Sequence, residues 1–160
     1  ARLTEYAAEK PTATYHEGSV WTYAGNYDIA LPCATQNEID GDAAKRLVAQ
    51  GVKVVSEGAN MPSNIDAINV YKENGILYGP AKAANAGGVA VSALEMSQNS
   101  QRLSWTREEV DGRLKDIMTN IFNTAKTTAE TYGLGKDYLA GANIAAFENV
   151  ANAMIAQGLV

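Results

Sequence analysis

The sequence has 160 residues, a length that suits one domain with a core of its own. Hydrophobic residues make up 46% and charged residues 19% of it, as in ordinary globular domains. The net charge is −5 and no run of Lys and Arg occurs, which argues against nucleic acid or a membrane surface as the main partner, because both need a concentrated basic patch. No apolar stretch is long enough to cross a bilayer. The single cysteine, Cys33, excludes an internal disulfide and favours a reducing, cytoplasmic compartment.

The first half of the sequence predicts short strands that alternate with helices. A helix is expected over residues 2–10, before Pro11. Because the chain opens inside this helix without an initiating Met, we expect a fragment of a longer protein. β-Branched and apolar runs predict further elements, which are strands at 12–16, 27–31, 52–56 and 76–78 and helices at 38–50 and 63–73.

This alternation is typical of an α/β fold with a partial doubly wound, Rossmann-like parallel sheet of about four strands. The strand at 52–56 carries apolar residues on both faces, as expected where helices cover both sides of a sheet.

Beyond residue 84 the pattern predicts helices only. The first is expected over 86–102, and the second begins with a capping box formed by Thr106 and Glu109. The last is expected over 137–157, with a buried apolar face made of Ile144, Phe147, Val150, Ala151, Met154 and Ile155.

An Asn follows three of the predicted strands, each in a loop of small residues: Asn37, Asn60 and Asn85. Ligands of an open parallel sheet bind beyond the carboxyl ends of its strands. Small residues let a flat ligand approach the backbone, and an amide pairs with a carboxamide or a ribose hydroxyl. Each Asn could instead cap the helix behind it. Three amides at equivalent places favour a ligand-facing edge suited to the nicotinamide-ribose end of a dinucleotide.

The helix expected after Asn85 begins near the glycine pair Gly87-Gly88. Such a pair allows close approach and leaves N–H groups free for a ligand. Ser92 lies one turn beyond Gly88, so its hydroxyl could face the same space. The alternative is a closely packed helix entry, with Ser92 bonded back to its own helix.

Six stretches resemble motifs of the hexameric bacterial-type glutamate dehydrogenases, and together they span nearly the whole chain. They are LPCATQNE (31–38), EGANMP (57–62), KAANAGGV (82–89), LEMSQN (94–99), LSW (103–105) and GANIA (141–145). The resemblance implies that residues 1–105 are the back half of a dinucleotide-binding domain and that 106–160 form a helical segment packed on the same domain.

The resemblance also implies roles for individual residues. Those expected to line the nicotinamide and its ribose are Ala34, Thr35, Asn37 and Asn60. Asn85 would lie between cofactor and substrate. Val89 and Ser92 would hold the side chain of glutamate, with the Ser92 hydroxyl on its γ-carboxylate.

The implied activity is the NAD- or NADP-dependent oxidative deamination of L-glutamate to 2-oxoglutarate and ammonia, or the reverse, by a cytoplasmic homo-hexamer. The sequence has no G-x-G-x-x-G loop, and the family's catalytic lysines and Asp belong to an N-terminal domain. We therefore expect no catalytic residue in this chain and no turnover by the chain alone. We expect structural roles for the remaining reactive side chains, which are His16, Cys33, Glu57 and Lys82. No set of His, Cys or carboxylates has metal-ligand spacing.

Two alternatives remain open at this point. The chain could be a non-catalytic nucleotide-binding or assembly module that keeps part of a Rossmann scaffold. It could also come from a leucine, valine or phenylalanine dehydrogenase, although an apolar residue would suit those substrates better than Ser92 does.

Overall fold

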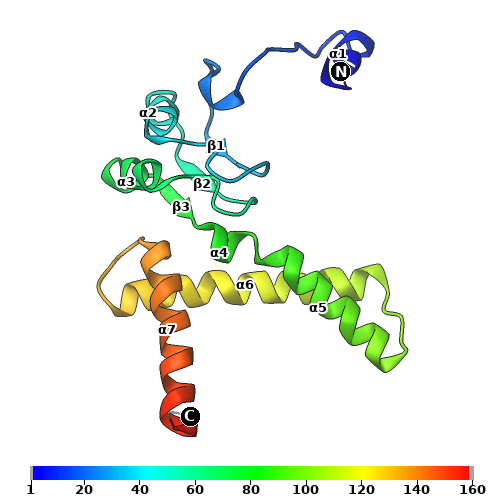
Figure 1. Cartoon of the computed structure of the whole chain (residues 1–160), viewed down its shortest axis with the longest axis vertical. Coiled ribbons are helices and arrows are strands. Elements are labelled where there is room, and N and C mark those ends of the chain that lie inside the picture. The colour runs from blue at the N-terminus through cyan, green and yellow to red at the C-terminus, as the bar shows by residue number, and fades with distance from the viewer. Residues whose placement is uncertain (1, 159–160) are drawn as a thin grey trace.

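The computed structural model describes residues 2–158, which form a small sheet domain above an array of long helices (Figure 1). The sheet is parallel and has the order β1-β2-β3, with strands β1 (Ile29–Ala30), β2 (Val54–Ser56) and β3 (Leu77–Gly79). Ile29 pairs with Val54, and Val54 pairs with Leu77. The predicted parallel α/β class is confirmed.

The sheet has three strands in the described chain, so the prediction of about four is corrected. Residues 12–16 were expected to be the first strand, but they are irregular chain between helix α1 (Arg2–Glu9) and the short 3-10 helix η1 (Val20–Thr22). Their side chains are mostly exposed. β-Branched residues favour a strand only where they pack on a half-buried pleated sheet. Residues 12–16 pair with no strand of the described chain.

One face of the sheet is covered by α2 (Gly41–Ala49) and α3 (Ile65–Glu73), which pack against each other (Figure 1). Every second strand residue points into this layer, and the largest buried side chain there is Tyr71. The core contains Ala30, Ile39, Ala43, Ala44, Leu47, Val52, Val55, Ala67, Val70, Tyr71 and Tyr78. Both helices begin later than predicted, because the chain before them stays extended up to their caps, Asp40 and Asn64.

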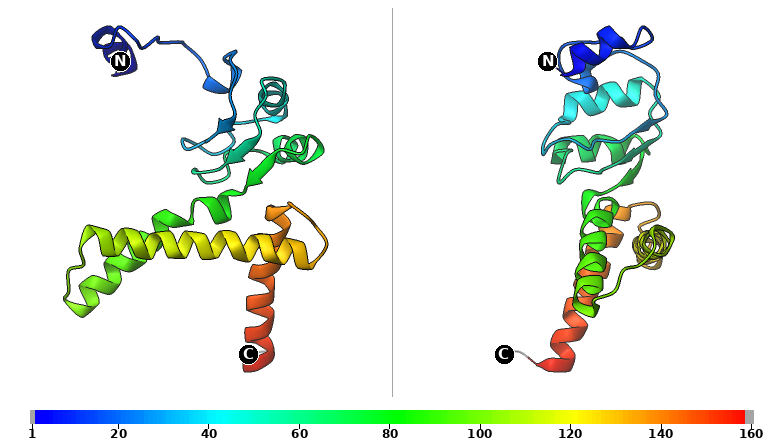
Figure 2. Two further views of the ribbon diagram at one scale, coloured as in Figure 1. Left: turned by 180° about the vertical axis from the view of Figure 1, so that it is seen from behind. Right: turned by 90° about the vertical axis from the view of Figure 1, so that its right-hand side faces the viewer.

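The opposite face of the sheet meets the C-terminal helices, so helices lie on both sides as predicted. After β3 the chain forms α4 (Ala81–Ala84), α5 (Ala86–Gln101), α6 (Arg107–Thr131) and α7 (Tyr138–Gln157). Figure 2 shows α6 crossing below the sheet, with α5 along one half of it and α7 leaving from the other end. The predicted capping box at Thr106 and Glu109 is present. None of the helices described within 2–158 is long and apolar enough to span a membrane.

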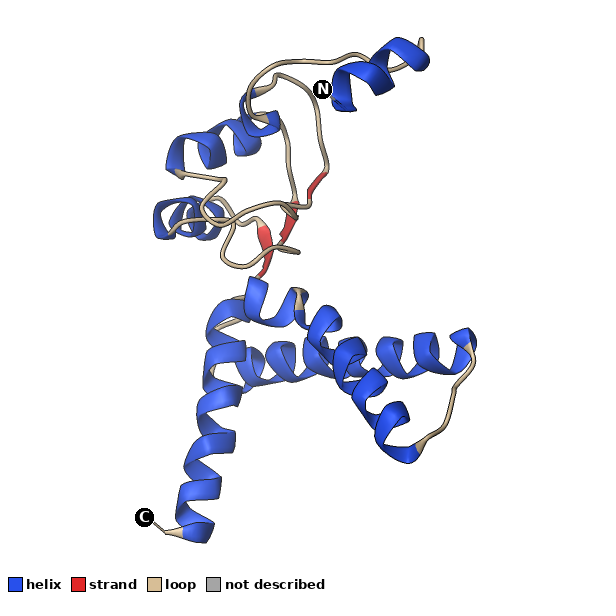
Figure 3. Cartoon of the chain, turned by 45° about the vertical axis from the view of Figure 1, so that its right-hand side comes forward, coloured by secondary structure: helices blue, strands red, loops and turns tan. Residues whose placement is uncertain are grey.

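The predicted buried face of α7 is wrong for most of its residues from Phe147 onward. Phe147 and Ile155 are 71% and 82% exposed, and Val150 and Met154 are exposed as well. The first turns of α7 pack on α6 and β3, and the helix then runs beyond both (Figure 3). An apolar stripe predicts that a helix face is buried against another surface, but it does not show which surface that is.

Candidate functional site

The loops that follow β1 and β2 lie side by side at the carboxyl edge of the sheet. The N–H groups of Gly58 and Ala59 donate to the Pro32 oxygen at 2.9 and 3.1 Å, and the Asn37 N–H donates to the Met61 oxygen at 2.9 Å. A parallel bridge between residues 39 and 63 continues this pairing beyond the strands. The two loops therefore form one bonded unit.

The segment after β3 joins this unit through side-chain amides. Asn85 Nδ2 donates to Asn60 Oδ1 at 2.7 Å and more weakly to the Ala59 oxygen at 3.3 Å. Since Asn37 is bonded to Met61, the residue after Asn60, all three predicted asparagines lie at one edge of the sheet. We call this group, Asn37, Asn60 and Asn85, the amide edge.

Helix capping does not account for the amide edge. The side chains that cap α2 and α3 belong to Asp40 and Asn64, at 2.8 and 2.9 Å from the N–H groups that they accept. Asn85 precedes α5 but makes no side-chain cap bond there. Asn37 is exposed and has φ of 55°, a left-handed conformation that Asn tolerates better than most residues. The capping alternative is therefore wrong for these three residues.

Glu38 orders the loop that carries two other predicted site residues. Its Oε1 accepts the main-chain N–H groups of Ala34 and Thr35 at 3.0 and 3.2 Å. Its Oε2 accepts the indole N–H of Trp21 at 2.8 Å. The N–H groups of Ala34 and Thr35 are thus already engaged, and both residues offer exposed, compact side chains. The role of Glu38 could not be predicted from the sequence. The predicted helix begins at residue 38, and an acidic residue in the first turn of a helix is ordinary.

Glu57 is a carboxylate buried behind the amide edge. It is 2% exposed, its Oε1 accepts the Ser63 N–H at 3.1 Å, and its Oε2 accepts the Ala81 N–H at 2.9 Å. Burial raises the pKa of Tyr78, and the neighbouring Glu57 raises it further. Burial also raises the pKa of Tyr71, to about 12, and its hydroxyl lies 3.2 Å from Ser63 Oγ. The prediction that Glu57 makes a structural hydrogen bond is confirmed. Its partners, Ser63 and Ala81, could not be predicted from the sequence.

The two residues predicted to hold substrate lie on α5. Val89 and Ser92 are three residues apart, so they share one exposed side of the helix. The Ser92 hydroxyl donates to the Gly88 oxygen at 3.3 Å. This bond to its own helix is the alternative to a ligand contact that the sequence left open. A Cβ on Gly87 would lie 3.5 Å from Leu114 and Met118, so this glycine faces α6, whereas Gly88 has open space around it.

The other reactive side chains are not gathered into a cluster. His16 is exposed and lies against Tyr23, with 4.2 Å between the ring centroids and the two rings tilted by 39°. Cys33 is exposed, with its sulfur against Gly58. Lys82 donates a hydrogen bond to Asn143 Oδ1, which links α4 to α7. Within the described chain no group of three or more His, Cys, Asp or Glu could hold a metal ion.

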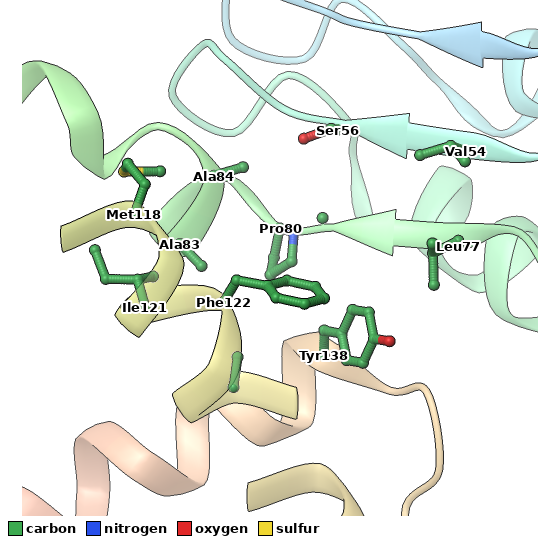
Figure 4. A pocket seen from close by; sticks show the side chains of 12 residues that line it. Val54, Ser56, Leu77, Pro80, Ala83, Ala84, Met118, Ile121, Phe122 and Tyr138 are labelled. Carbon is green, nitrogen blue, oxygen red and sulfur yellow. The ribbon is translucent and has the colours of Figure 1, made fainter. Parts of the chain in front are cut away.

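An apolar pocket of about 280 Å³ lies between the second face of the sheet and the C-terminal helices. Figure 4 shows the rings of Phe122 and Tyr138 below Pro80 and Leu77. None of the predicted site residues lines this pocket. Its walls offer few polar groups, so it does not resemble a site for a carboxamide and a sugar.

Known proteins are similar to this chain in sequence and fold. The sequence model of the family described as Glutamate/Leucine/Phenylalanine/Valine dehydrogenase matches residues 1–158. The NADP-specific glutamate dehydrogenases of Giardia intestinalis and Escherichia coli are 55% and 50% identical over 99% of this chain, which covers 36% and 35% of their lengths. The crystal structure of Plasmodium falciparum glutamate dehydrogenase superposes with a TM-score of 0.93 at 51% identity, over 100% of this chain and 34% of that one. The chain therefore spans about a third of the length of these relatives.

Proposed function

This chain belongs to the Glutamate/Leucine/Phenylalanine/Valine dehydrogenase family, and we propose that the protein of which it forms a part is an NAD(P)-dependent glutamate dehydrogenase. Such an enzyme oxidises L-glutamate to 2-oxoglutarate and ammonia, or runs the reverse. The names of the relatives support this activity, since the proteins of Giardia intestinalis and Escherichia coli, at 55% and 50% identity, are NADP-specific glutamate dehydrogenases. The observation that carries the proposal within the chain is the pairing of Asn60 with Asn85 at the sheet edge.

The amide edge has polar groups suited to a nicotinamide and its ribose. The Asn85–Asn60 bond uses an N–H of Asn85 and the oxygen of Asn60. It leaves the Asn85 oxygen to accept from a carboxamide NH₂ and the Asn60 NH₂ to donate to a carbonyl or a hydroxyl oxygen. Hydride transfer is the chemistry that the bound coenzyme supplies. The protein groups hold the ring in register with the α-carbon of the substrate.

The loop of Ala34 and Thr35 forms the second wall of the proposed coenzyme site. Glu38 fixes its backbone through two N–H groups. A site held by supporting hydrogen bonds keeps its geometry without help from the ligand. The short side chains of this loop permit close approach of a planar ring.

Val89 and Ser92 are proposed to receive the side chain of glutamate. The Ser92 hydroxyl can leave the long bond to Gly88 and donate to the γ-carboxylate, because a charged acceptor makes the stronger bond. This residue separates glutamate from leucine, valine and phenylalanine as the substrate.

A serine on the same helix provides a matched control for this role. Ser97 is exposed on α5 and bonds back to the Ala93 oxygen at 2.9 Å. In the complete polypeptide, Ser92→Val is expected to lower kcat/KM for glutamate by about tenfold or more, whereas Ser97→Val leaves it unchanged. Equal kinetics of the two variants and the wild type would remove Ser92 from the site.

The phosphate-binding loop and the catalytic groups are proposed to belong to the remaining two thirds of the polypeptide, since the relatives are about three times as long. β1 is the edge strand of the sheet in the described chain, so its free edge can pair with a strand from the rest of the polypeptide. We also propose that the complete protein is a cytoplasmic homo-hexamer.

The test of the function is a spectrophotometric assay of the complete polypeptide with NAD and NADP. We expect reduced coenzyme to form with glutamate and much less to form with leucine, valine or phenylalanine. The 160-residue chain alone should give none. A complete polypeptide without turnover on any of the four amino acids would favour the non-catalytic binding module instead.

A further inference from the structure

Glu57 connects two segments of the sheet edge that are distant in sequence. One oxygen accepts the N–H of Ser63 in the loop after β2, and the other accepts the N–H of Ala81 at the start of α4. Asn60 lies within the first of these segments, and Asn85 follows the second directly. The carboxylate thus joins them from inside the protein, and the Asn60–Asn85 bond joins them at the surface.

The burial of Glu57 excludes contact with a ligand at the surface. At 2% exposure the carboxylate cannot reach a bound molecule, and none of the ion pairs found within 2–158 involves it. A buried carboxylate is costly unless hydrogen bonds satisfy it. Here two main-chain N–H groups and the Tyr78 hydroxyl satisfy it, and the main-chain bonds fix the two backbones relative to each other.

The glutamine variant would preserve the shape of this side chain but not its bonding. Both N–H partners belong to the main chain, so both require an acceptor at Glu57. Glutamine has one acceptor oxygen, and its NH₂ group would face a second donor. Either the loop of residues 57–63 or the start of α4 must then move away.

On the premise of the coenzyme site proposed above, we propose that Glu57 is a positioning residue that sets the separation of Asn60 and Asn85 and thereby the affinity for the coenzyme. It acts through the two segments that it joins and does not touch the ligand.

The test measures binding of NADPH and NADH to the complete polypeptide by fluorescence, well below the midpoint of thermal unfolding. Glu57→Gln is expected to raise the Kd of the preferred coenzyme by about tenfold or more, because small misplacements of a binding group are costly. Asp28→Asn is the charge-matched control. Asp28 is exposed and paired only at the surface with Lys53, so this variant should bind as the wild type does.

Ala81→Pro tests the same bond from its other end. Proline is well accepted at the first position of a helix, and Pro80 already has the extended backbone that a following proline requires. The variant removes the N–H that Glu57 Oε2 accepts and keeps the carboxylate. We expect it also to weaken coenzyme binding, while circular dichroism stays that of the wild type.

Each outcome decides the proposal. A folded Glu57→Gln variant with the Kd of the wild type overturns it, and Ala81→Pro decides in the same way if Glu57→Gln does not fold. If neither variant folds, Glu57 serves stability alone and the proposal is rejected. A wild type that binds no coenzyme rejects it too. If the wild type binds coenzyme but does not oxidise glutamate, the proposed activity is refuted. The Kd values of the variants then decide the role of Glu57.

Discussion

The crossing of α6 and α7 depends on Gly141, and Gly141→Ala should destabilise the chain. A Cβ at this position would lie 3.0 Å from the carbonyl carbon of Ala125 and 3.0 Å from the Cβ of Ala129, and closer still to the Ala125 oxygen. Carbon atoms pack best at about 3.5–4.0 Å, so the helices must separate by about 0.5 Å or more. Overpacking of this kind costs about 3 kcal/mol. Alanine regains about 1 kcal/mol of helix propensity, which leaves a net loss of about 2 kcal/mol.

Gly112 on α6 provides the matched control, because a Cβ there would meet nothing within 4 Å. Gly112→Ala should therefore raise the free energy of unfolding by about 0.5–1 kcal/mol through propensity alone. Urea unfolding followed by far-ultraviolet circular dichroism measures both variants. If Gly141→Ala were as stable as the wild type, or more stable, the inferred close contact of α6 and α7 would be wrong.

Two further substitutions test the core and the start of α7. Tyr71→Phe removes the hydroxyl that meets buried Ser63 Oγ, so the free energy of unfolding by urea should fall by about 1–2 kcal/mol; an unchanged value would contradict the bond. Burial raises the pKa of Asp137, but the Lys72 ammonium and main-chain N–H groups lower it more, so the pKa of this carboxyl lies below its ordinary value. The stabilisation is therefore present above about pH 4 and lost as pH falls through the lower folded pKa. Asp137→Asn, which can still cap α7, should cost up to about 1 kcal/mol at pH 7, and the difference from the wild type should shrink as the pH falls below about 4; a difference in urea titrations that does not change with pH would contradict the ion pair.

The parts of the fold that could be predicted from the sequence follow local rules or strand topology. The capping box at Thr106 needs only residues 106–109, and it forms as predicted. The convergence of Asn37, Asn60 and Asn85 follows because parallel strands end at one edge. The position of these three residues could therefore be predicted without knowing their contacts.

The features that sequence reasoning missed depend on the partners that a segment meets. Residues 12–16 have strand composition but no neighbouring strand, and the second half of α7 has an apolar stripe without a surface against it. The roles of Glu38 and Glu57 rest on bonds from side chain to backbone across loops. Such bonds exist only once the loops have their conformation, so no spacing in the sequence encodes them.

A crystal structure of the complete polypeptide with NADP bound is the most direct test of the amide edge as the coenzyme site. We predict that the nicotinamide carboxamide or its ribose lies within hydrogen-bond distance of Asn60 and Asn85, with Asn37 and the Ala34–Thr35 loop beside the ring. A coenzyme whose nicotinamide lies away from these loops would contradict the account.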